Sequence, residues 1–198
     1  MLVMQAGGQI VARDFEGILQ AELAPQQRDV AQASLAALRF YTEFADPSKP
    51  GYTWNASLPE ARKAFIAGDL ALYIGLSSEK NLIKAANPNL NFAIAPVPQR
   101  RSATKSIDSG YTYAFAIPRT TKNALGALQV AYKLAAPDTA TIISQRLNMP
   151  SARRDVLAKP FTSDLNDFNK QAILVRSWSD PDPVKTSEIF RAMIEDTV

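Results

Sequence analysis

The sequence predicts a helix-rich, layered α/β fold. Stretches with apolar residues at helical spacing alternate along the chain with short apolar runs of strand length. Turn residues, mostly Gly, Pro and Asn, separate the two kinds of segment. Strands that alternate with helices usually pack as a sheet covered by helices. The 198 residues, 46% of them hydrophobic, are enough for one or two cores.

The N-terminal half is expected to carry three helices after a short helix end at residues 1–6. Pro25 opens the first, over residues 26–44, whose apolar side chains fall mostly on one stripe. Ser57 and Glu60 have the spacing of a capping box, which predicts a helix over residues 58–67. The third helix is predicted for residues 78–86, before Asn87 and Pro88.

Three short apolar runs are predicted to be strands. They cover residues 70–74, 90–95 and 111–117, and Pro residues follow the second and third. A shorter extended piece is expected at residues 9–11.

Helices dominate the predicted C-terminal half. We expect one over residues 123–136, with Thr121 as its cap, and a short one over residues 139–145. A further short helix should begin at Asp155, another should cover residues 167–175, and an amphipathic helix should run from Thr186 to the end.

Composition narrows the chemistry. The chain has no His and no Cys, which removes Cys and His nucleophiles, nearly all zinc sites, Fe–S clusters and disulfides. We therefore expect a binding protein, not an enzyme, with no cofactor and no metal. The net charge is +3 and basic residues are scattered apart from one group, Arg100, Arg101 and Lys105, so no nucleic-acid partner is expected. No apolar run reaches the roughly 18 residues that span a membrane.

Residues 65–78 read as a helix end, a turn, a buried strand and a second helix start. Gly68 follows the predicted helix over residues 58–67, at the position where a left-handed C-cap residue is expected. Gly75 allows a close approach of the backbone. Ser77 and Ser78 can cap the following helix, and Glu79 in its first turn suits the helix dipole. Free N–H groups at such a helix start predict a ligand site.

This segment also resembles a family signature. The pattern Phe65-x-x-Gly68-x-x-Ala71-x-Tyr73-x-Gly75 is similar to the central motif of the extracellular solute-binding proteins of ABC importers, in the sugar-binding branch called family 1. Further segments resemble that family in the same order along the chain: residues 4–10, 36–44, 91–99, 109–117, 149–155, 171–178 and 189–194.

The resemblance implies a class II periplasmic-binding-protein-like fold, represented by a helix-rich C-terminal lobe with a small mixed sheet. Residues 1–99 and 160–198 would form this lobe, and residues 110–150 would be a strand-helix segment of the N-terminal lobe. Residues 100–109 and 151–159 would be the hinge crossings. Family members are about twice as long, so the chain is expected to be a fragment, with weak binding and with export signals upstream. No signal peptide is visible in the chain itself.

The function implied is extracytoplasmic binding of a solute, a sugar or oligosaccharide, and its delivery to an ABC permease. The parent protein would lie in the periplasm or be anchored at the cell surface as a lipoprotein. Sugars stack on planar aromatic rings and bond fixed polar groups. The ligand-binding residues expected on this basis are Trp178, Ser77, Ser78, Gly110, Tyr111, Trp54 and Gln5. Self-association through the surface left by the missing lobe is a further expectation, with residues 111–117 as the exposed edge.

Two alternatives remain open. The chain could be a protein-interaction module, which would lack a concave polar and aromatic surface near Trp178. It could also be a serine acyl hydrolase, because Ser77 and Lys80 have the Ser-x-x-Lys spacing that brings an amine to a hydroxyl one helical turn away. Lys185 and Thr186 only faintly match the second element of such enzymes.

Overall fold

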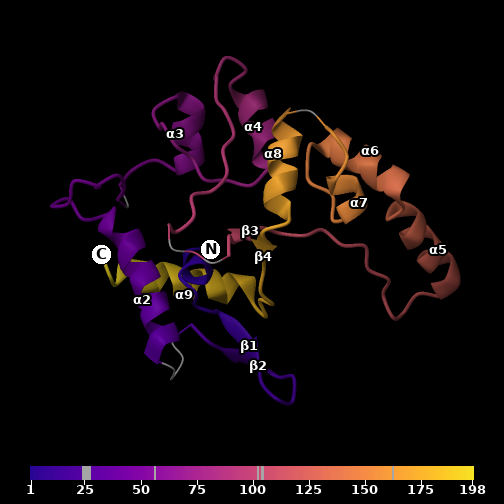
Figure 1. The fold of residues 1–198 in the computed structure, drawn as a ribbon, viewed down its shortest axis with the longest axis horizontal. Coiled ribbons are helices and arrows are strands. Elements are labelled where there is room, and N and C mark those ends of the chain that lie inside the picture. The colour runs from indigo at the N-terminus through magenta and orange to yellow at the C-terminus, as the bar shows by residue number, and fades with distance from the viewer. Residues whose placement is uncertain (24–27, 56, 102, 104, 162) are drawn as a thin grey trace. The chain divides into compact units, whose positions relative to one another are not determined.

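The computed structural model describes residues 1–23, 28–55, 57–101, 103, 105–161 and 163–198 (Figure 1). It confirms a helix-rich α/β protein with small sheets. The chain forms two compact units. The first comprises Met1–Pro59, Pro98–Ser109 and Arg176–Val198, and the second comprises Glu60–Val97 and Gly110–Val175. The division into lobes and hinge crossings drawn from the sequence stays a prediction.

The first unit contains three helices and a β-hairpin in its described part: α1 (Leu2–Gln5), β1 (Val11–Arg13), β2 (Leu19–Ala21), α2 (Arg28–Glu43) and α9 (Pro183–Glu195). Helix α1 packs on α2 through Gly8. A Cβ atom at Gly8 would lie 2.9 Å from both Ser34 Oγ and Val3 Cγ1, so only glycine allows this approach.

The hairpin is antiparallel, with Ala12 paired to Gln20. Its loop is held by the Asp14 carboxylate, which accepts hydrogen bonds from the backbone N–H groups of Glu16 and Ile18 at 3.0 and 2.8 Å. Gly17 takes a left-handed φ of 81°. An Asp followed by Gly three residues later is a turn signal, so the hairpin was detectable in the sequence. The apolar pattern itself predicts only the extended piece at residues 9–11.

The second unit contains six helices in its described part: α3 (Ala61–Ala67), α4 (Glu79–Ala86), α5 (Ala124–Leu134), α6 (Pro137–Leu147), α7 (Arg154–Leu157) and α8 (Ser163–Ala172). Contacts join α3 to α4, α5 to α6 and α6 to α7. The other small sheet is made by the two-residue strands β3 (Asp108–Ser109) and β4 (Val175–Arg176), which stand at the points in the sequence where the units divide.

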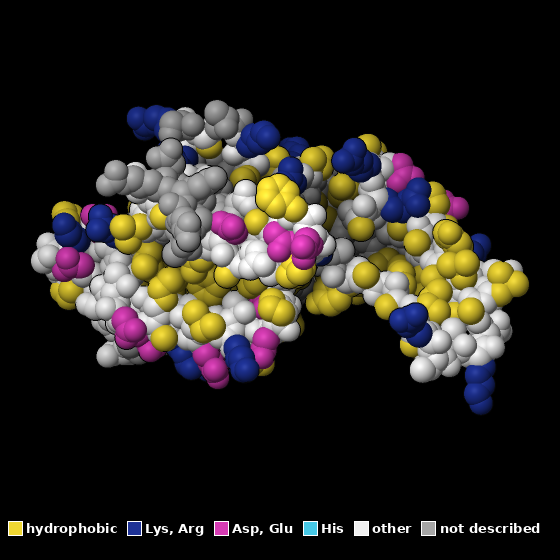
Figure 2. Space-filling view, turned by 90° about the horizontal axis from the view of Figure 1, so that it is seen from below, with side chains coloured by type: hydrophobic (Ala, Val, Ile, Leu, Met, Phe, Trp, Pro, Cys, Tyr) yellow, Lys and Arg dark blue, Asp and Glu magenta, His cyan; other side chains and the backbone are white. Residues whose placement is uncertain are grey.

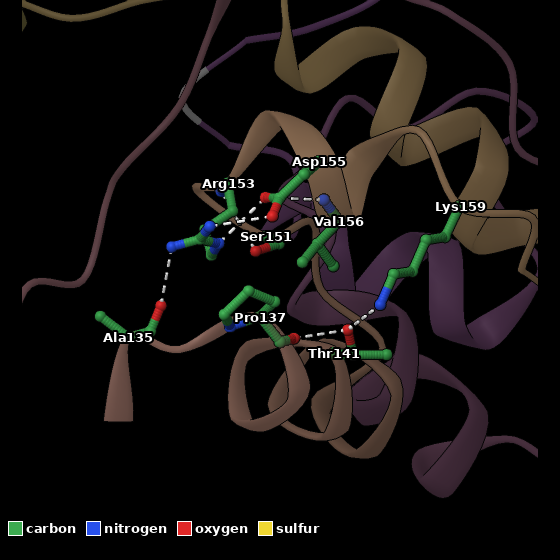
Figure 3. Close-up of polar contacts among 8 residues, drawn as sticks. All are labelled: Ala135, Pro137, Thr141, Ser151, Arg153, Asp155, Val156 and Lys159. Carbon is green, nitrogen blue, oxygen red and sulfur yellow. Dashed lines mark hydrogen bonds and ion pairs between the residues drawn. The ribbon is translucent and has the colours of Figure 1, made fainter. Parts of the chain in front are cut away.

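Polar contacts tie the residues on either side of α7 to the end of α5 and to α6 (Figure 3). The Arg153 guanidinium donates to both oxygens of Asp155, at 2.9 and 2.8 Å, and to the Ala135 carbonyl at 3.1 Å. The Lys159 ammonium donates to Thr141 Oγ1 at 3.0 Å, and that hydroxyl donates to the Pro137 carbonyl at 2.6 Å. Side-chain hydrogen bonds therefore connect the residues around α7 to α5 and α6.

Most predicted helices form, but their starts differ. The capping box at Ser57 and Glu60 is absent: α3 begins at Ala61, with Glu60 as an N-cap that makes no side-chain bond. Asn123, not Thr121, caps α5 by accepting a hydrogen bond from Gly126 N at 2.9 Å. Asn at the N-cap outcompetes the more distant Thr because its side-chain oxygen reaches the N3 amide. The opening predicted at Pro25 and the first residues of that helix, 26 and 27, lie outside the described residues.

The three predicted strands do not form. Residues 70–74, 90–95 and 111–117 join no ladder. An apolar run indicates burial and β-propensity, but a strand also needs a neighbour that pairs with its backbone. These segments instead expose large side chains, among them Leu72 at 85%, Tyr111 at 82% and Tyr113 at 83%.

The buried core of the described chain is small. Its hydrophobic members are Ala37, Ala45, Ile83, Val156 and Leu165. Hydrophobic side chains are also widespread on the face drawn in Figure 2, with acidic and basic residues interspersed among them. Within the described residues, no helix is long and apolar enough to cross a membrane.

Candidate functional site

The Glu79 carboxylate is the centre of the 65–78 segment. It accepts hydrogen bonds from the Tyr73 hydroxyl at 3.0 and 3.1 Å and from the Leu76 N–H at 2.7 Å. Arg62, on α3, donates to it at 3.2 Å. The side chain of Glu79 is 18% exposed, so this ion pair is only partly screened by water. One carboxylate thereby joins α3, the connecting segment and α4.

Aromatic rings continue this cluster. Phe65 stacks on Tyr73 with ring centroids 5.6 Å apart, and Phe92 meets Phe65 edge to face at 5.6 Å. The Lys84 ammonium lies 4.9 Å from the centre of the Phe92 ring. Such aromatic and cation–π contacts stabilise the packing of these three rings, although the segment forms no strand ladder.

The two glycines of the segment play the predicted roles. Gly68 is the left-handed C-cap of α3, with φ 89°. A Cβ atom at Gly75 would lie 2.5 Å from both the Tyr73 ring and the Glu79 carboxylate. The close approach predicted at Gly75 is made to the protein's own Tyr73 and Glu79 side chains.

The start of α4 differs from the predicted capping by serine side chains. Ser78 is the N-cap, but its hydroxyl makes no capping bond. Glu79 in the first turn reaches back to the amide of Leu76 instead. Ser77 and Ser78 are both half-buried.

The surroundings of Tyr73 shift its acidity. Burial, the hydrogen bond to Glu79 and the negative charge of that carboxylate raise the pKa of the Tyr73 phenol above its usual value, against a smaller opposing effect of Arg62. The phenol therefore stays protonated and acts as a donor at neutral pH.

The other predicted residues of the second unit are Gly110 and Tyr111. Gly110 is half-buried, and a Cβ there would lie 3.2 Å from Val175 Cγ1. Tyr111 projects from the surface of its unit.

In the first unit, the Gln5 side chain makes hydrogen bonds within the protein. Its amide donates to the carbonyls of Pro98 at 3.2 Å and Ile107 at 3.0 Å. Trp54 contacts the Tyr41 ring at a centroid distance of 5.3 Å and a tilt of 39°. These contacts give both residues a packing role.

Trp178 is half-buried in the loop before α9. Asp180 shapes this loop by accepting bonds from Thr186 Oγ1 at 2.8 Å and from Asp182 N at 3.1 Å. Asp182 then caps α9 through Lys185 N at 3.1 Å. The indole is therefore carried by an ordered turn attached to a helix.

The seven predicted residues divide between the units. Gln5, Trp54 and Trp178 belong to the first, and Ser77, Ser78, Gly110 and Tyr111 to the second. Within the described part of the first unit, no hydrogen bond or ring contact joins its three candidates to one another.

In the Ser-x-x-Lys pair, the lysine has a different partner from Ser77. The Lys80 ammonium forms an ion pair with Asp164 on α8. No hydrogen bond between it and Ser77 Oγ occurs among the described contacts. A general base in such a dyad must be a free amine beside the hydroxyl. The described residues also contain no group of three or more acidic side chains placed to hold a metal ion.

Two features of the structure were not found from the sequence. The pairing of Arg62 with Glu79 was missed because 17 positions separate the residues. The burial of Asn169 on α8 was missed because an Asn in a polar helix normally faces water.

Comparison of the chain with protein-family models, with curated proteins and with solved structures gave no match.

Proposed function

We propose that this chain belongs to an extracytoplasmic solute-binding protein of an ABC importer and contributes to binding a sugar or oligosaccharide. The observation that carries the proposal is the 65–78 segment. Its signature residues Phe65, Tyr73 and Gly75 resemble the family motif and make mutual contacts. The other resembling segments follow in family order along the chain.

The finer fold assignment, a class II C-terminal lobe with parts of an N-terminal lobe, is part of the same proposal. A helix-rich α/β chain in two compact units is compatible with it. Proteins of this class close around a ligand by hinge motion, and the closed form engages the permease. No bond is made or broken, so no catalytic group or cofactor is required.

In this proposal the indole of Trp178 supplies a stacking face for a sugar ring. Its half-buried position on an ordered loop leaves part of the ring accessible. Stacking on an aromatic ring needs no charge and suits the apolar faces of pyranose rings. Trp54 is the second candidate, although Tyr41 already covers part of its surface.

The test is calorimetric titration of the chain with neutral mono- and oligosaccharides, followed in parallel by tryptophan fluorescence. Saturable heat with at least one glycan, together with a fluorescence change, supports the proposal. If no glycan produces heat or a spectral change at millimolar concentration, the chain does not bind sugars and the proposal fails.

A second candidate is a protein-interaction module, favoured by the exposed aromatic residues of segment 111–117. Tyr111, Tyr113 and Phe115 alternate along this segment, and all three are exposed. Its backbone joins no ladder, so a strand of another copy can pair with it. The exposed segment 111–117 therefore predicts that two copies of the chain form a dimer by strand exchange. Light scattering over a concentration series distinguishes the two candidates, because a monomer at all concentrations removes the second.

A further inference from the structure

Helix α5 turns its large side chains outward from the second unit. It contacts α6, yet none of its residues is buried. The half-buried ones are mostly small: Gly126, Ala127, Ala131 and Leu134. The large apolar ones are exposed: Leu125 by 69%, Leu128 by 42%, Val130 by 60% and Tyr132 by 70%. A surface helix normally packs its large apolar residues inward, so α5 presents an apolar surface that the described part of its unit does not cover.

Helical spacing gathers three of these exposed residues on one face. Leu125, Leu128 and Tyr132 follow one another at intervals of three and four positions, which places them in one row along the helix. We call this row the α5 stripe. Gln129 and Lys133 form the neighbouring row, again by helical spacing. Exposed apolar surface bordered by polar residues marks a site of interaction with a protein or a membrane.

The charges within α5 and just before it are all positive. Residues 109–137 include the basic residues Arg119, Lys122 and Lys133 and no acidic residue. All three are exposed, and none forms an ion pair with a carboxylate in the part of the chain that the structure describes. The next acidic residue along the chain, Asp138 in the first turn of α6, is exposed as well. Charge complementarity therefore favours an anionic partner for this surface.

A second copy of the chain fits this surface poorly, because pairing two α5 stripes would bring the basic residues of both copies together. An anionic bilayer has the complementary charge, and its headgroup region accepts side chains of any shape. Tyr132 suits that region, since a tyrosine combines an apolar ring with a polar tip. Lys and Arg side chains bury their apolar stems there while their charged ends remain at the phosphates.

We propose that α5 binds the surface of an anionic lipid bilayer. The α5 stripe enters the boundary between headgroups and acyl chains, and Arg119, Lys122 and Lys133 contact lipid phosphates. This surface shares no residue with the sugar-binding proposal or with the strand-exchange segment 111–117.

Vesicle flotation of the whole chain provides the test. One set of vesicles contains equal parts of phosphatidylcholine and phosphatidylglycerol, and the other contains phosphatidylcholine alone. We expect the chain to bind the anionic vesicles at low salt, to bind the neutral vesicles at least about tenfold more weakly, and to be released as the salt concentration approaches about 0.5 M. Failure to bind the anionic vesicles, or equal binding to both sets, overturns the proposal. Binding to polyglutamate without binding to vesicles would assign the surface to an acidic protein and overturns it too.

Leu125→Gln tests the apolar contact. It should weaken binding to the anionic vesicles by about tenfold or more, because an inserted apolar side chain is lost. Leu82→Gln is the matched control: Leu82 is 58% exposed on α4 of the same unit, and its replacement should leave binding unchanged.

Lys133→Gln tests the charge. Its loss should weaken binding about fivefold. Lys63→Gln removes the same charge from α3, where Lys63 pairs with Glu60, and should have little effect. All the substituted side chains are exposed, so melting temperatures should stay unchanged. Equal effects of variant and control would show that α5 is not the contact, and the wild-type flotation decides the matter even if a variant fails to fold.

Discussion

The Tyr73 hydroxyl donates to both oxygens of the Glu79 carboxylate, at 3.0 and 3.1 Å, across a turn that contains Gly75. The same carboxylate bonds Arg62 of α3 and the amide of Leu76, in the segment before α4. Three parts of the second unit, α3, the connecting segment and α4, therefore depend on one side chain. Glu79 supports the segment structurally, which explains why the serines beside it are not needed as caps.

Glu79→Gln should destabilise the second unit. The amide keeps the shape but loses the ion pair with Arg62 and one acceptor oxygen, which should cost about 1–3 kcal/mol because hydrogen bonds to charged groups exceed neutral ones. Urea unfolding measures the change. Glu60→Gln is the matched control: Glu60 also pairs with Arg62 but is half exposed, so its loss should cost at most about 0.5 kcal/mol. Equal effects of the two substitutions would show that Glu79 has no special role.

Stability should fall at alkaline pH through Tyr73. Its pKa is raised in the folded state by burial and by Glu79, so the folded chain holds the phenolic proton more tightly than the unfolded chain does. The stabilisation is complete below the usual tyrosine pKa and is lost as the pH rises through the folded value. Ultraviolet titration of tyrosinate should show one group that ionises late. This group should disappear in Tyr73→Phe, and a titration identical in both proteins contradicts the prediction.

Gly75→Ala should disrupt the same cluster from the backbone side. The added methyl would lie 2.5 Å from the Tyr73 ring and from a Glu79 oxygen, so both side chains must move and their hydrogen bond is strained. We expect a loss of about 1–3 kcal/mol, typical of overpacking. Gly51→Ala serves as control, because the nearest atoms there, on Phe44, lie at an ordinary 3.5 Å. Thermal melts followed by circular dichroism compare the two, and equal melting temperatures would count against the close approach.

Trp178→Ala tests the sugar proposal at one residue. If the indole stacks on a pyranose ring, its removal should weaken binding by about tenfold or more, since a stacked aromatic pair contributes on the order of 1 kcal/mol beyond its buried area. Calorimetry with the tightest glycan measures the loss. Trp54→Ala should have a smaller effect, because Tyr41 already covers that ring. Binding unchanged by the loss of Trp178 would remove its assigned role.

The helices were the predictable part of this chain. The long helix α2, helix α4 with its N-cap at Ser78 and the left-handed end of α3 at Gly68 follow from local patterns within a few residues. Caps are decided by whichever polar side chain reaches a free amide, and the sequence shows only the candidates. The sequence therefore offers Thr121 as a cap, whereas Asn123 makes the capping bond in the structure.

The candidate site was less predictable. The seven ligand residues were chosen by resemblance and remain a prediction, whereas Gln5 and Trp54 turn out to have local packing partners. The Ser-x-x-Lys spacing indicates a dyad of Ser77 and Lys80, but the Lys80 ammonium pairs with Asp164, which is distant in sequence. Short-range spacing cannot reveal a competing partner that the fold brings in.

By itself, the sequence determined the helix-rich α/β class, the positions of most helices, and the absence of His and Cys chemistry, because these depend on local propensity and on composition. Only the tertiary structure decided which apolar runs become strands, since a strand requires a neighbour to pair with its backbone. It also decided that Glu79 joins Arg62, Tyr73 and Leu76, and that Asn169 is buried without a partner. Both depend on contacts between residues that lie apart in sequence, and on the water that those contacts exclude.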